Sequence, residues 1–221
     1  MRAVTVFITG GTGYIGKRLI PLLIERGHAV SAIVRAGSEK RLPKGVRSIV
    51  ADPLRDGSYA DKITGADVFI HLIGTPHPSP AKAKQFGEID LVSIQVAARA
   101  ASSAGVRHFI YVSVAHPAPM MKEFIAVRSE GERLLEASGM NATFVRPWYV
   151  LGPGHRWPYA LIPFYWILEM LPGSRESARR LGLVSLKQML NALVWATEHP
   201  PVGVRVVDVP KIRELSRKRT S

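Results

Sequence analysis

A glycine-rich stretch near the start of the chain constrains the fold more than any other sequence feature. It reads VFITGGTGYIGKRL over residues 6–19, and it places Gly10, Gly13 and Gly16 between an apolar run typical of a β-strand and a run of helix-forming residues. In that context the spacing G-x-x-G-x-x-G predicts a strand, a tight turn and a helix that together bind the pyrophosphate of a dinucleotide. The alternative is a glycine-rich turn that binds no ligand.

Each of these glycines has an expected role because glycine lacks a Cβ atom. Gly10 and Gly13 permit the turn and let a pyrophosphate approach the backbone N–H groups, while Gly16 is expected to let the helix pack closely on the sheet. The N-terminus of that helix would then face the phosphates. Neighbouring residues at the end of the strand and the start of the helix are also expected to contact the nucleotide. They are Thr9, Tyr14 and Ile15.

Further along the chain, β-type apolar runs alternate with helical patterns, which predicts repeated β-α-β units around a parallel sheet. The expected strands are residues 3–9, 29–34, 47–51, 67–73, 106–114, 142–146 and 202–208. The expected helices are one with the apolar stripe Ile15, Leu19, Leu22 and Leu23, then residues 84–104 and 120–138, and one marked by Leu186, Leu190, Leu193 and Val194. With 221 residues, 47% of them hydrophobic, the chain can form one domain, residues 1–221. The predicted fold is an α/β, doubly wound parallel-sheet Rossmann fold.

Three proline-rich loops follow expected strands, and they read GTPHPSPAK, AHPAPMMK and RPWYVLGPGHRWP. In an open parallel sheet, the loops at the carboxyl ends of the strands line the ligand crevice. We therefore expect these loops to form the walls of a site, with residues 147–183 as a small C-terminal substrate or lid lobe. Residues at these strand ends that are expected to contact the nucleotide are Leu72, Gly74, Ser113 and Pro147.

The end of the second expected strand carries the residues that would read the adenosine ribose. Arg35 stands where an NAD-specific site usually has an acidic residue, which favours NADP over NAD because a guanidinium can bind the 2′-phosphate. Ser38 and Lys40 can assist from the same loop. A solvated surface arginine is the alternative. Asp52, after the third expected strand, can accept from the adenine amino group or serve as a helix cap or turn residue.

The chain is strongly basic, with 30 Lys and Arg against 17 Asp and Glu and a formal net charge of +13. Basic residues are scattered, with local enrichment at residues 35–47 and 211–219, and no pattern of interleaved aromatic and basic residues appears. This distribution favours a solvated basic surface over sequence-specific nucleic-acid binding. The last residues, KIRELSRKRTS at 211–221, predict a short helix that frays into a basic tail, and weak association with a membrane surface is an open alternative.

The absence of cysteine excludes disulfides, thiolate catalysis and Cys-ligated zinc. No histidines pair at a spacing typical of metal ligands, so no metal site is expected. The chain starts MRAVTVFITGG, which lacks the order of segments in a signal peptide, and we expect a cytoplasmic protein. No oligomeric state is predicted.

Five segments together resemble a known family over nearly the whole chain: TGGTGYIG, ADPLRD, AGVRHFIYVSV, RSEGERLLEASGMNATFVRP and GVRVVDVP. They are similar to the atypical short-chain dehydrogenases/reductases. Related groups in that family are the NmrA-like proteins, the sugar-nucleotide epimerase/dehydratase-like proteins and the Rossmann-fold accessory subunit of respiratory complex I. The resemblance implies a Rossmann fold that binds NAD(P).

The wider superfamily's active enzymes use a Tyr-x-x-x-Lys pair on the helix after the fifth strand, with a serine or threonine near that strand's end. The matching positions here are Phe124 and Arg128, with Ser113 at the strand end. Phenylalanine cannot exchange a proton, whereas Arg128 can still donate to the nicotinamide ribose. The resemblance therefore implies NADP(H) binding without the usual proton transfer, in nucleotide sensing or support of a partner.

The alternative is an active reductase or epimerase-like enzyme that acts on an apolar carbonyl or a quinone. It needs a displaced proton donor, and His116 is a candidate because it lies in the loop after the fifth expected strand. Three tyrosines can serve in the same way, namely Tyr111, Tyr149 and Tyr159. The weak catalytic candidates are thus Ser113, His116 and Arg128.

The most lipophilic stretch is RWPYALIPFYWILEMLPG, residues 156–173. Pro158, Pro163 and Glu169 interrupt it, so it does not have the pattern of a transmembrane helix. One interpretation is an aromatic wall over the nicotinamide that selects an apolar or quinone-like ligand, and the other is a buried or subunit-facing helix. The rings that would form the wall are Trp157, Tyr159, Phe164 and Trp166.

Overall fold

The strand order of the main sheet places β1 and β4 side by side in its interior. The computed structural model describes residues 2–118, 120–153 and 180–217, and in it seven parallel strands pair in the order β3-β2-β1-β4-β5-β6-β9. Their bounds are β1 Thr5–Thr9, β2 Ala29–Val34, β3 Arg47–Val50, β4 Val68–His71, β5 His108–Val112, β6 Ala142–Val145 and β9 Val204–Val207. The order runs outward from β1 in both directions, which puts a topological switch point between β1 and β4. The predicted doubly wound α/β fold is confirmed, with strand ends that differ from the predicted ones by no more than two residues.

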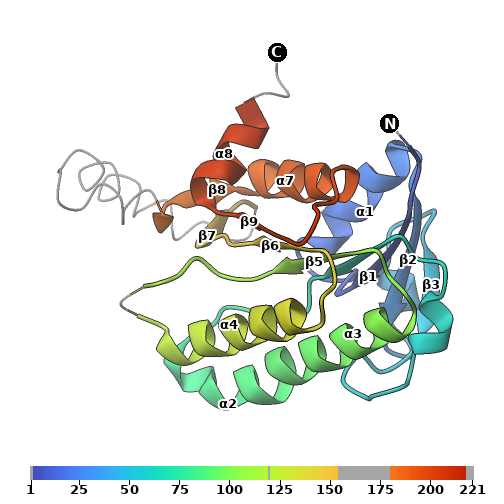
Figure 1. Ribbon diagram of the computed structural model, residues 1–221, viewed down its shortest axis with the longest axis horizontal. Helices are drawn as coiled ribbons and strands as arrows, with labels where there is room; N and C mark the ends of the chain where they lie inside the picture. Colours follow the sequence, from blue (N-terminus) through green and yellow to red (C-terminus); the bar gives the residue numbers. More distant parts are fainter. Residues whose placement is uncertain (1, 119, 154–179, 218–221) are drawn as a thin grey trace.

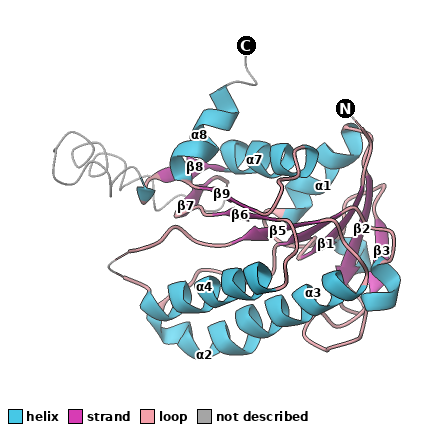
Figure 2. Cartoon of the chain, viewed as in Figure 1, coloured by secondary structure: helices cyan, strands magenta, loops and turns pink. Residues whose placement is uncertain are grey.

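Helices cover both faces of the sheet (Figures 1 and 2). One face carries α1 (Gly16–Glu25), α7 (Leu186–Glu198) and α8 (Val209–Arg217), and the other carries α2 (Ala83–Gln85), α3 (Val92–Ser103) and α4 (Lys122–Ala137). Short helical turns connect these elements: η1 Glu39–Arg41, η2 Ala60–Ile63, η3 Pro80–Lys82 and the π-helical η4 Phe86–Leu91. The helix expected over residues 84–104 is therefore interrupted by a π-helical turn.

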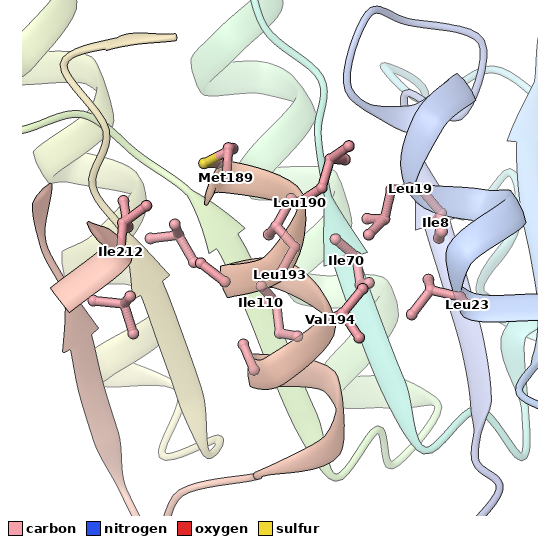
Figure 3. Packing of buried hydrophobic residues seen from close by; sticks show 14 of the residues in the cluster. Ile8, Leu19, Leu23, Ile70, Ile110, Met189, Leu190, Leu193, Val194 and Ile212 are labelled. Carbon is pink, nitrogen blue, oxygen red and sulfur yellow. The ribbon is translucent and has the colours of Figure 1, made fainter. Parts of the chain in front are cut away.

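Side-chain alternation along the strands divides the core into two clusters. In β1, Val6 and Ile8 belong to one cluster and Phe7 to the other, as the period of two in a strand requires. The first cluster packs β1, β4 and β5 against α1 and α7 (Figure 3), and it includes Ile8, Leu19, Leu23, Ile70, Ile110 and Leu193. The second is rich in aromatic rings, with ring centroids 5.1 Å apart for Phe7 and Phe69 and 4.8 Å apart for Phe69 and Phe109.

Two short strands lie outside the main sheet, and the sequence pattern does not predict them. β7 (Tyr149–Leu151) and β8 (Leu183–Ser185) pair in parallel as a separate sheet. Three residues are too few to establish a period of two, and β7 lies inside a loop that its prolines and glycines mark as irregular. Ser185 also caps α7, since its Oγ accepts from Gln188 N at 3.2 Å.

The segment expected as a basic tail is partly a docked helix. Residues 211–217 belong to α8, which begins two residues earlier, and Ile212 and Leu215 are buried in the first core cluster. A helix here is confirmed, but its apolar face holds it against the protein. The lipophilic segment 156–173 lies outside the described residues, together with Trp157, Tyr159, Phe164 and Trp166. Within the described ranges, no helix is both long enough and apolar enough to cross a bilayer.

Candidate functional site

The glycine loop between β1 and α1 closes on itself and on the end of β4. Gly10 has φ +76°, and a Cβ there would lie 2.8 Å from the carbonyl carbon of Leu72. Gly13 N donates to Gly10 O at 3.0 Å, which fixes the turn. A Cβ on Gly16 would collide with the backbone of Gly10 and Gly11. Gly16 thus gives room to the loop itself, which corrects the expectation that it mainly allows helix-to-sheet packing.

The N-terminus of α1 is not neutralised by the chain itself. Ile15 occupies the N-cap position without a side-chain cap, and the first turn carries no acidic residue. The positive end of the helix dipole therefore faces no acidic side chain of the helix itself and can attract an anion. This is an environment that a pyrophosphate fits.

A pocket of about 460 Å³ lies along the carboxyl ends of β1 to β4, a size typical of ligand sites. Seven of the predicted nucleotide-binding residues line it: Gly10, Gly13, Arg35, Ser38, Asp52, Leu72 and Gly74. Several lining residues were missed by the sequence reasoning, among them Thr12, Arg41, Leu54, Ile73 and Ile89. Three of these, Leu54, Ile73 and Ile89, are apolar residues that no motif distinguishes. The pocket, the glycine cradle and the open helix end together fit a dinucleotide.

Two arginines stand at the end of the pocket formed by β2 and β3. Arg35 follows β2 directly, and the turn η1 brings Arg41 to the pocket lining. All three cationic residues of this loop are exposed, but Lys40 is not among the described lining residues. Ser38 N donates to Arg35 O at 3.0 Å, which shapes this loop. Asp52 lines the same end, and its Oδ1 accepts from Leu54 N at 2.9 Å. The turn role considered for Asp52 is thus present, and its side chain still faces the pocket.

Other predicted site residues have different surroundings. Thr9 is buried, and its Oγ1 lies 2.9 Å from His71 Nδ1. The ring of Tyr14 lies under the Arg18 guanidinium, with 4.4 Å between Cζ and the ring centroid. Pro147 is buried, and its carbonyl accepts from Ala115 N at 2.9 Å. The predicted residues that are not among the described pocket-lining residues are Thr9, Tyr14, Ile15, Gly16, Lys40, Ser113, Arg128 and Pro147.

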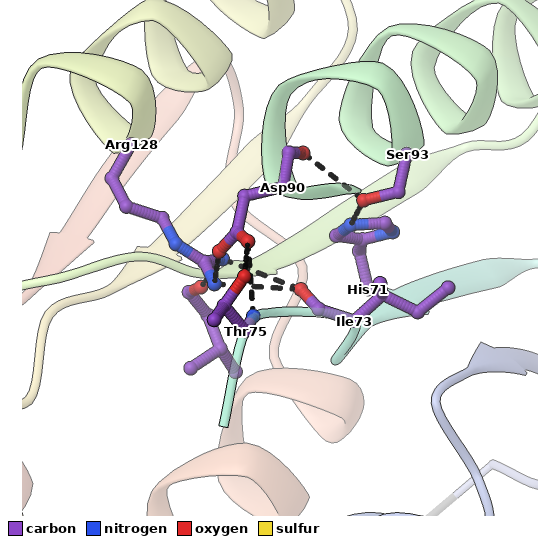
Figure 4. A network of polar contacts seen from close by, with 7 residues as sticks. His71, Ile73, Thr75, Asp90, Ser93 and Arg128 are labelled. Atoms are coloured by element: carbon purple, nitrogen blue, oxygen red, sulfur yellow. Dashed lines mark hydrogen bonds and ion pairs between the residues drawn. The ribbon is translucent and has the colours of Figure 1, made fainter. Parts of the chain in front are cut away.

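Behind the pocket, Asp90 joins α4 to the segment after β4 (Figure 4). Its Oδ1 lies 2.6 Å from Arg128 Nη2, and its Oδ2 accepts from Thr75 N at 2.9 Å and from Thr75 Oγ1 at 2.6 Å. Arg128 Nη1 also donates to the carbonyl of Val112 at 3.0 Å. In this arrangement the terminal nitrogens of Arg128 bind protein groups, where the sequence predicted a nicotinamide ribose.

His71 extends the same network towards β1. Its Nδ1 lies 2.9 Å from Thr9 Oγ1, and its Nε2 lies 3.2 Å from Ser93 Oγ, which in turn donates to the Asp90 carbonyl at 3.0 Å. Burial, with the nearby charge of Arg128, lowers the pKa of His71 from 6.5 to about 3. The imidazole is therefore neutral at physiological pH and acts as a structural hydrogen-bonding group.

Phe124 fills the position where a catalytic tyrosine is expected. Its ring centroid lies 5.1 Å from that of Phe86 and 5.1 Å from Arg128 Cζ. The buried face of α4 carries Arg128, Gly131, Glu132 and Leu135. Two ionised side chains turn inward here because each finds a partner inside the protein.

A second ionic cluster lies at the ends of β5 and β6. His116 Nε2 lies 3.3 Å from Glu132 Oε2, and Glu132 also binds Arg146 through Nε at 2.8 Å and Nη2 at 2.5 Å. Glu132 is buried, whereas the His116 side chain is 23% exposed. The carboxylate therefore orients an imidazole that a ligand can reach.

The remaining candidates for a proton donor are less favourably placed. Ser113 Oγ and Tyr111 Oη are both buried and have no hydrogen-bond partner in the described part of the chain. Burial raises the pKa of Tyr111, and burial also raises the pKa of Tyr149 on β7. Tyr159 lies outside the described residues. Among the described residues, no group of three or more His, Cys, Asp or Glu side chains could hold a metal ion.

A family model described as NAD(P)H-binding matches residues 10–156, which is more than half of the chain. The chain belongs to the NAD(P)H-binding family. Its matched region begins at Gly10 and contains the glycine loop, the pocket and the Asp90 network, so the family assignment and the site coincide.

Curated relatives of this NAD(P)H-binding protein include several reductases. A ceramide reductase of Caulobacter vibrioides is 26% identical over 90% of this chain and 62% of its own length. A ketoreductase of a farnesyl-dihydroquinoline oxide from Stigmatella aurantiaca is 26% identical over 66% of this chain and 50% of its own length. An uncharacterized sugar epimerase of Bacillus subtilis, YhfK, is 29% identical over 64% of this chain and 70% of its own length. The chain thus spans half to somewhat more than half of the two reductases.

Solved structures share the fold of this NAD(P)H-binding chain. MoeE5 in complex with UDP-glucose and NAD has a TM-score of 0.69 at 21% identity, over 98% of this chain and 82% of the other. The Bordetella bronchiseptica enzyme WbmH in complex with NAD⁺ has a TM-score of 0.69 at 23% identity, over 98% of this chain and 80% of the other. At these identities the likeness supports the Rossmann-like architecture.

Proposed function

We propose that this chain binds NADP(H) in the pocket along β1 to β4, with the 2′-phosphate between Arg35 and Arg41. The observation that carries the proposal is the pair of guanidinium groups lining the pocket end beside β2. Guanidinium groups form charge-assisted hydrogen bonds to phosphate oxygens, which the hydroxyl of NAD cannot match. Asp52 lies at the same end and suits the adenine amino group as an acceptor.

The main role that we propose is nucleotide binding without the proton transfer of the tyrosine–lysine enzymes, as in a nucleotide sensor or a supporting subunit. Phe124 carries no exchangeable proton, and Arg128 is held by Asp90. A ring of nearly the same shape as tyrosine preserves the packing of α4 against Phe86. These features support an intact nucleotide site with altered chemistry.

A second candidate function is NADPH-dependent reduction of an apolar carbonyl or quinone. It is favoured by His116, whose imidazole is oriented by Glu132 and partly exposed at the end of the sheet, and by the reductase names of two relatives. The nucleotide would supply a hydride to the substrate carbon, and His116 would give a proton to the substrate oxygen. The products would be NADP⁺ and an alcohol from a carbonyl substrate, or NADP⁺ and a hydroquinone from a quinone. We also propose that residues 147–183 form the substrate lobe. The parallel pairing of β7 with β8, which joins the two ends of this segment, favours that assignment.

Calorimetric titration of the protein with NADPH and NADH tests the main proposal. We expect NADPH to bind at least about tenfold more tightly, the usual scale for one charge-assisted hydrogen bond. Equal affinity for the two nucleotides would contradict the 2′-phosphate assignment. Oxidation of NADPH in the presence of carbonyls, quinones and sugar nucleotides separates the two candidate functions, because only the second predicts turnover.

A further inference from the structure

Asp90 and Arg128 form a buried ion pair directly behind the wall of the nucleotide pocket. Arg128 Nη2 lies 2.6 Å from Asp90 Oδ1, and the two side chains are 7% and 0% exposed, respectively (Figure 4). Gly74 lines the pocket and covers the pair: a Cβ on Gly74 would collide with Arg128 Nη2 and lie 3.2 Å from Asp90 Oδ1. A single glycine therefore separates the ion pair from a bound ligand.

The ion pair lies on the nicotinamide side of the switch point. A dinucleotide bound across this crevice places its adenosine half over β2 and β3 and its other half over β4 and β5. Gly74 follows β4, and Arg128 donates to the carbonyl of Val112, the last residue of β5. The charges of the pair thus act on the nicotinamide half more strongly than on the adenosine half.

Local structure aims the Asp90 carboxylate at Arg128. The carboxylate lies in the π-helical turn η4, whose wider winding breaks the regular helix at this point. Thr75 donates to Asp90 Oδ2 from both N and Oγ1, which leaves Oδ1 to bind Arg128. Arginine stays protonated even when buried. The pair therefore presents two opposite charges to the pocket and almost no net charge.

Asp90 is the carboxylate that neutralises Arg128 in the described part of the chain. The other side chains around the guanidinium are the rings of Tyr111 and Phe124, and His71 nearby is neutral. Glu132, one turn further along α4, is bound to Arg146. Removal of the Asp90 charge would leave an uncompensated cation behind Gly74.

We propose that Asp90 sets the relative affinity of this site for oxidised and reduced nucleotide by neutralising Arg128; this inference rests on the proposed binding of NADP(H). The oxidised nicotinamide ring carries a positive charge, and the reduced ring is neutral. An unpaired arginine behind a low-dielectric wall repels the oxidised ring, since charges interact more strongly there than in water. With Asp90 in place, this repulsion is cancelled and NADP⁺ can bind. A protein that responds to both redox states needs to bind both forms of the nucleotide.

The Asp90→Asn variant tests the proposal, with calorimetric affinities for NADPH, NADP⁺ and adenosine 2′,5′-bisphosphate. We expect NADP⁺ to lose roughly tenfold in affinity relative to NADPH. The bisphosphate carries the adenosine and its 2′-phosphate but no nicotinamide, so its affinity stays unchanged. Thr75→Val is the matched control, because it removes one hydrogen bond to Asp90 without a change of charge and leaves the ratio of NADP⁺ to NADPH affinity unchanged.

The Arg128→Gln variant gives an independent test of opposite sign. It leaves the Asp90 carboxylate uncompensated, so the affinity for NADP⁺ should rise relative to the affinity for NADPH. If the Asp90→Asn variant does not fold, this measurement tests the proposal by itself. An unchanged ratio of the two affinities in either folded variant would overturn the proposal and leave the pair a purely structural contact. Failure of the proposed function is distinct from this, because then neither NADPH nor the bisphosphate binds the unmodified protein.

Discussion

The ring of Phe124 lies against the guanidinium of Arg128, with 5.1 Å between the ring centroid and Cζ. The sequence resemblance predicts that these two positions correspond to the tyrosine and lysine of active short-chain dehydrogenases. In this protein the aromatic ring also lies against Phe86, and the cation is bound by Asp90. Both residues of the pair are thus engaged in packing and ionic contacts within the protein.

Substitution of Phe124 by tyrosine is expected to leave the protein without new NADPH-oxidising activity. The added hydroxyl has no lysine beside it, and Arg128 already has Asp90 as its ionic partner, so the phenol keeps a high pKa. Nucleotide affinity should stay within about twofold, because the ring shape is preserved. The measurement is the rate of NADPH oxidation with a panel of carbonyls and quinones. Phe124→Leu serves as the packing control and should lower stability by about 1 kcal/mol.

Substitution of His116 by glutamine distinguishes the two candidate functions. If the unmodified protein oxidises NADPH with a carbonyl or quinone, we expect the variant to lose at least about a hundredfold in rate, the usual contribution of a general acid. NADPH affinity should not change, because His116 contacts Glu132 outside the described pocket lining. Full turnover in the variant would eliminate His116 as the proton donor.

The parts of the fold that follow from periodicity could be predicted from the sequence. The strands of the main sheet and the glycine loop depend on local alternation and on glycine spacing, and their positions were correct to within two residues. The ionic interior of α4 could not be predicted in this way. The sequence resemblance assigns Arg128 to the nicotinamide ribose, and only the tertiary fold brings Asp90 to Arg128 and Arg146 to Glu132.

The same limit applies to the candidate site. Gly10, Arg35 and Asp52 were identified because they occupy fixed places at strand ends, whereas Arg41 reaches the pocket through the turn η1, for which the sequence carries no signal. The sequence pattern favours Lys40 beside Ser38 instead, and Lys40 is not among the described lining residues.

Arg41 lines the described pocket and its neighbour Lys40 does not, which provides a matched test of the 2′-phosphate site. Arg41→Gln is expected to weaken NADPH binding by about tenfold or more, since a charge-assisted hydrogen bond to phosphate is lost, and to leave NADH binding unchanged. Arg35→Asp should go further and invert the preference in favour of NADH. Lys40→Gln, one residue from Arg41 and exposed, is the control and should change neither affinity. A loss in the control equal to that in Arg41→Gln would indicate only a general effect of positive charge.

The glycine loop offers a second matched pair. Gly13 is exposed, and a Cβ there would meet only Gly10 O, at 3.1 Å, so Gly13→Val should fold but block the approach of the pyrophosphate and abolish nucleotide binding. Gly10→Val should instead lower stability by more than about 1 kcal/mol, because its φ is positive and the end of β4 lies in the way. Thermal unfolding without nucleotide and calorimetry with NADPH separate the two effects. Nucleotide binding retained in Gly13→Val would show that the loop is structural.

The buried histidines give this protein a predictable sensitivity to acid. The pKa of His71 is lowered to about 3 in the folded state, chiefly by burial, and that of His108 to about 4 for the same reason. In the unfolded chain both groups bind a proton near pH 6.5, so their contribution to stability is complete above that pH and falls as the pH drops towards the folded-state values.

The slope of stability against pH is therefore the quantity to measure. Each histidine should lower the free energy of unfolding by up to about 1.4 kcal/mol per pH unit, His71 between pH 6.5 and about 3 and His108 between pH 6.5 and about 4. His71→Asn removes one titrating group, so urea unfolding between pH 6 and pH 4 should show a shallower slope by up to that amount. The absolute stability of the variant will also fall, because the hydrogen bonds to Thr9 and Ser93 are weakened, but that loss is independent of pH. The carboxylates titrate equally in both proteins and do not affect this comparison. Identical slopes would mean that His71 is protonated in the folded state over this pH range, which would contradict a neutral imidazole bound to Thr9 and Ser93.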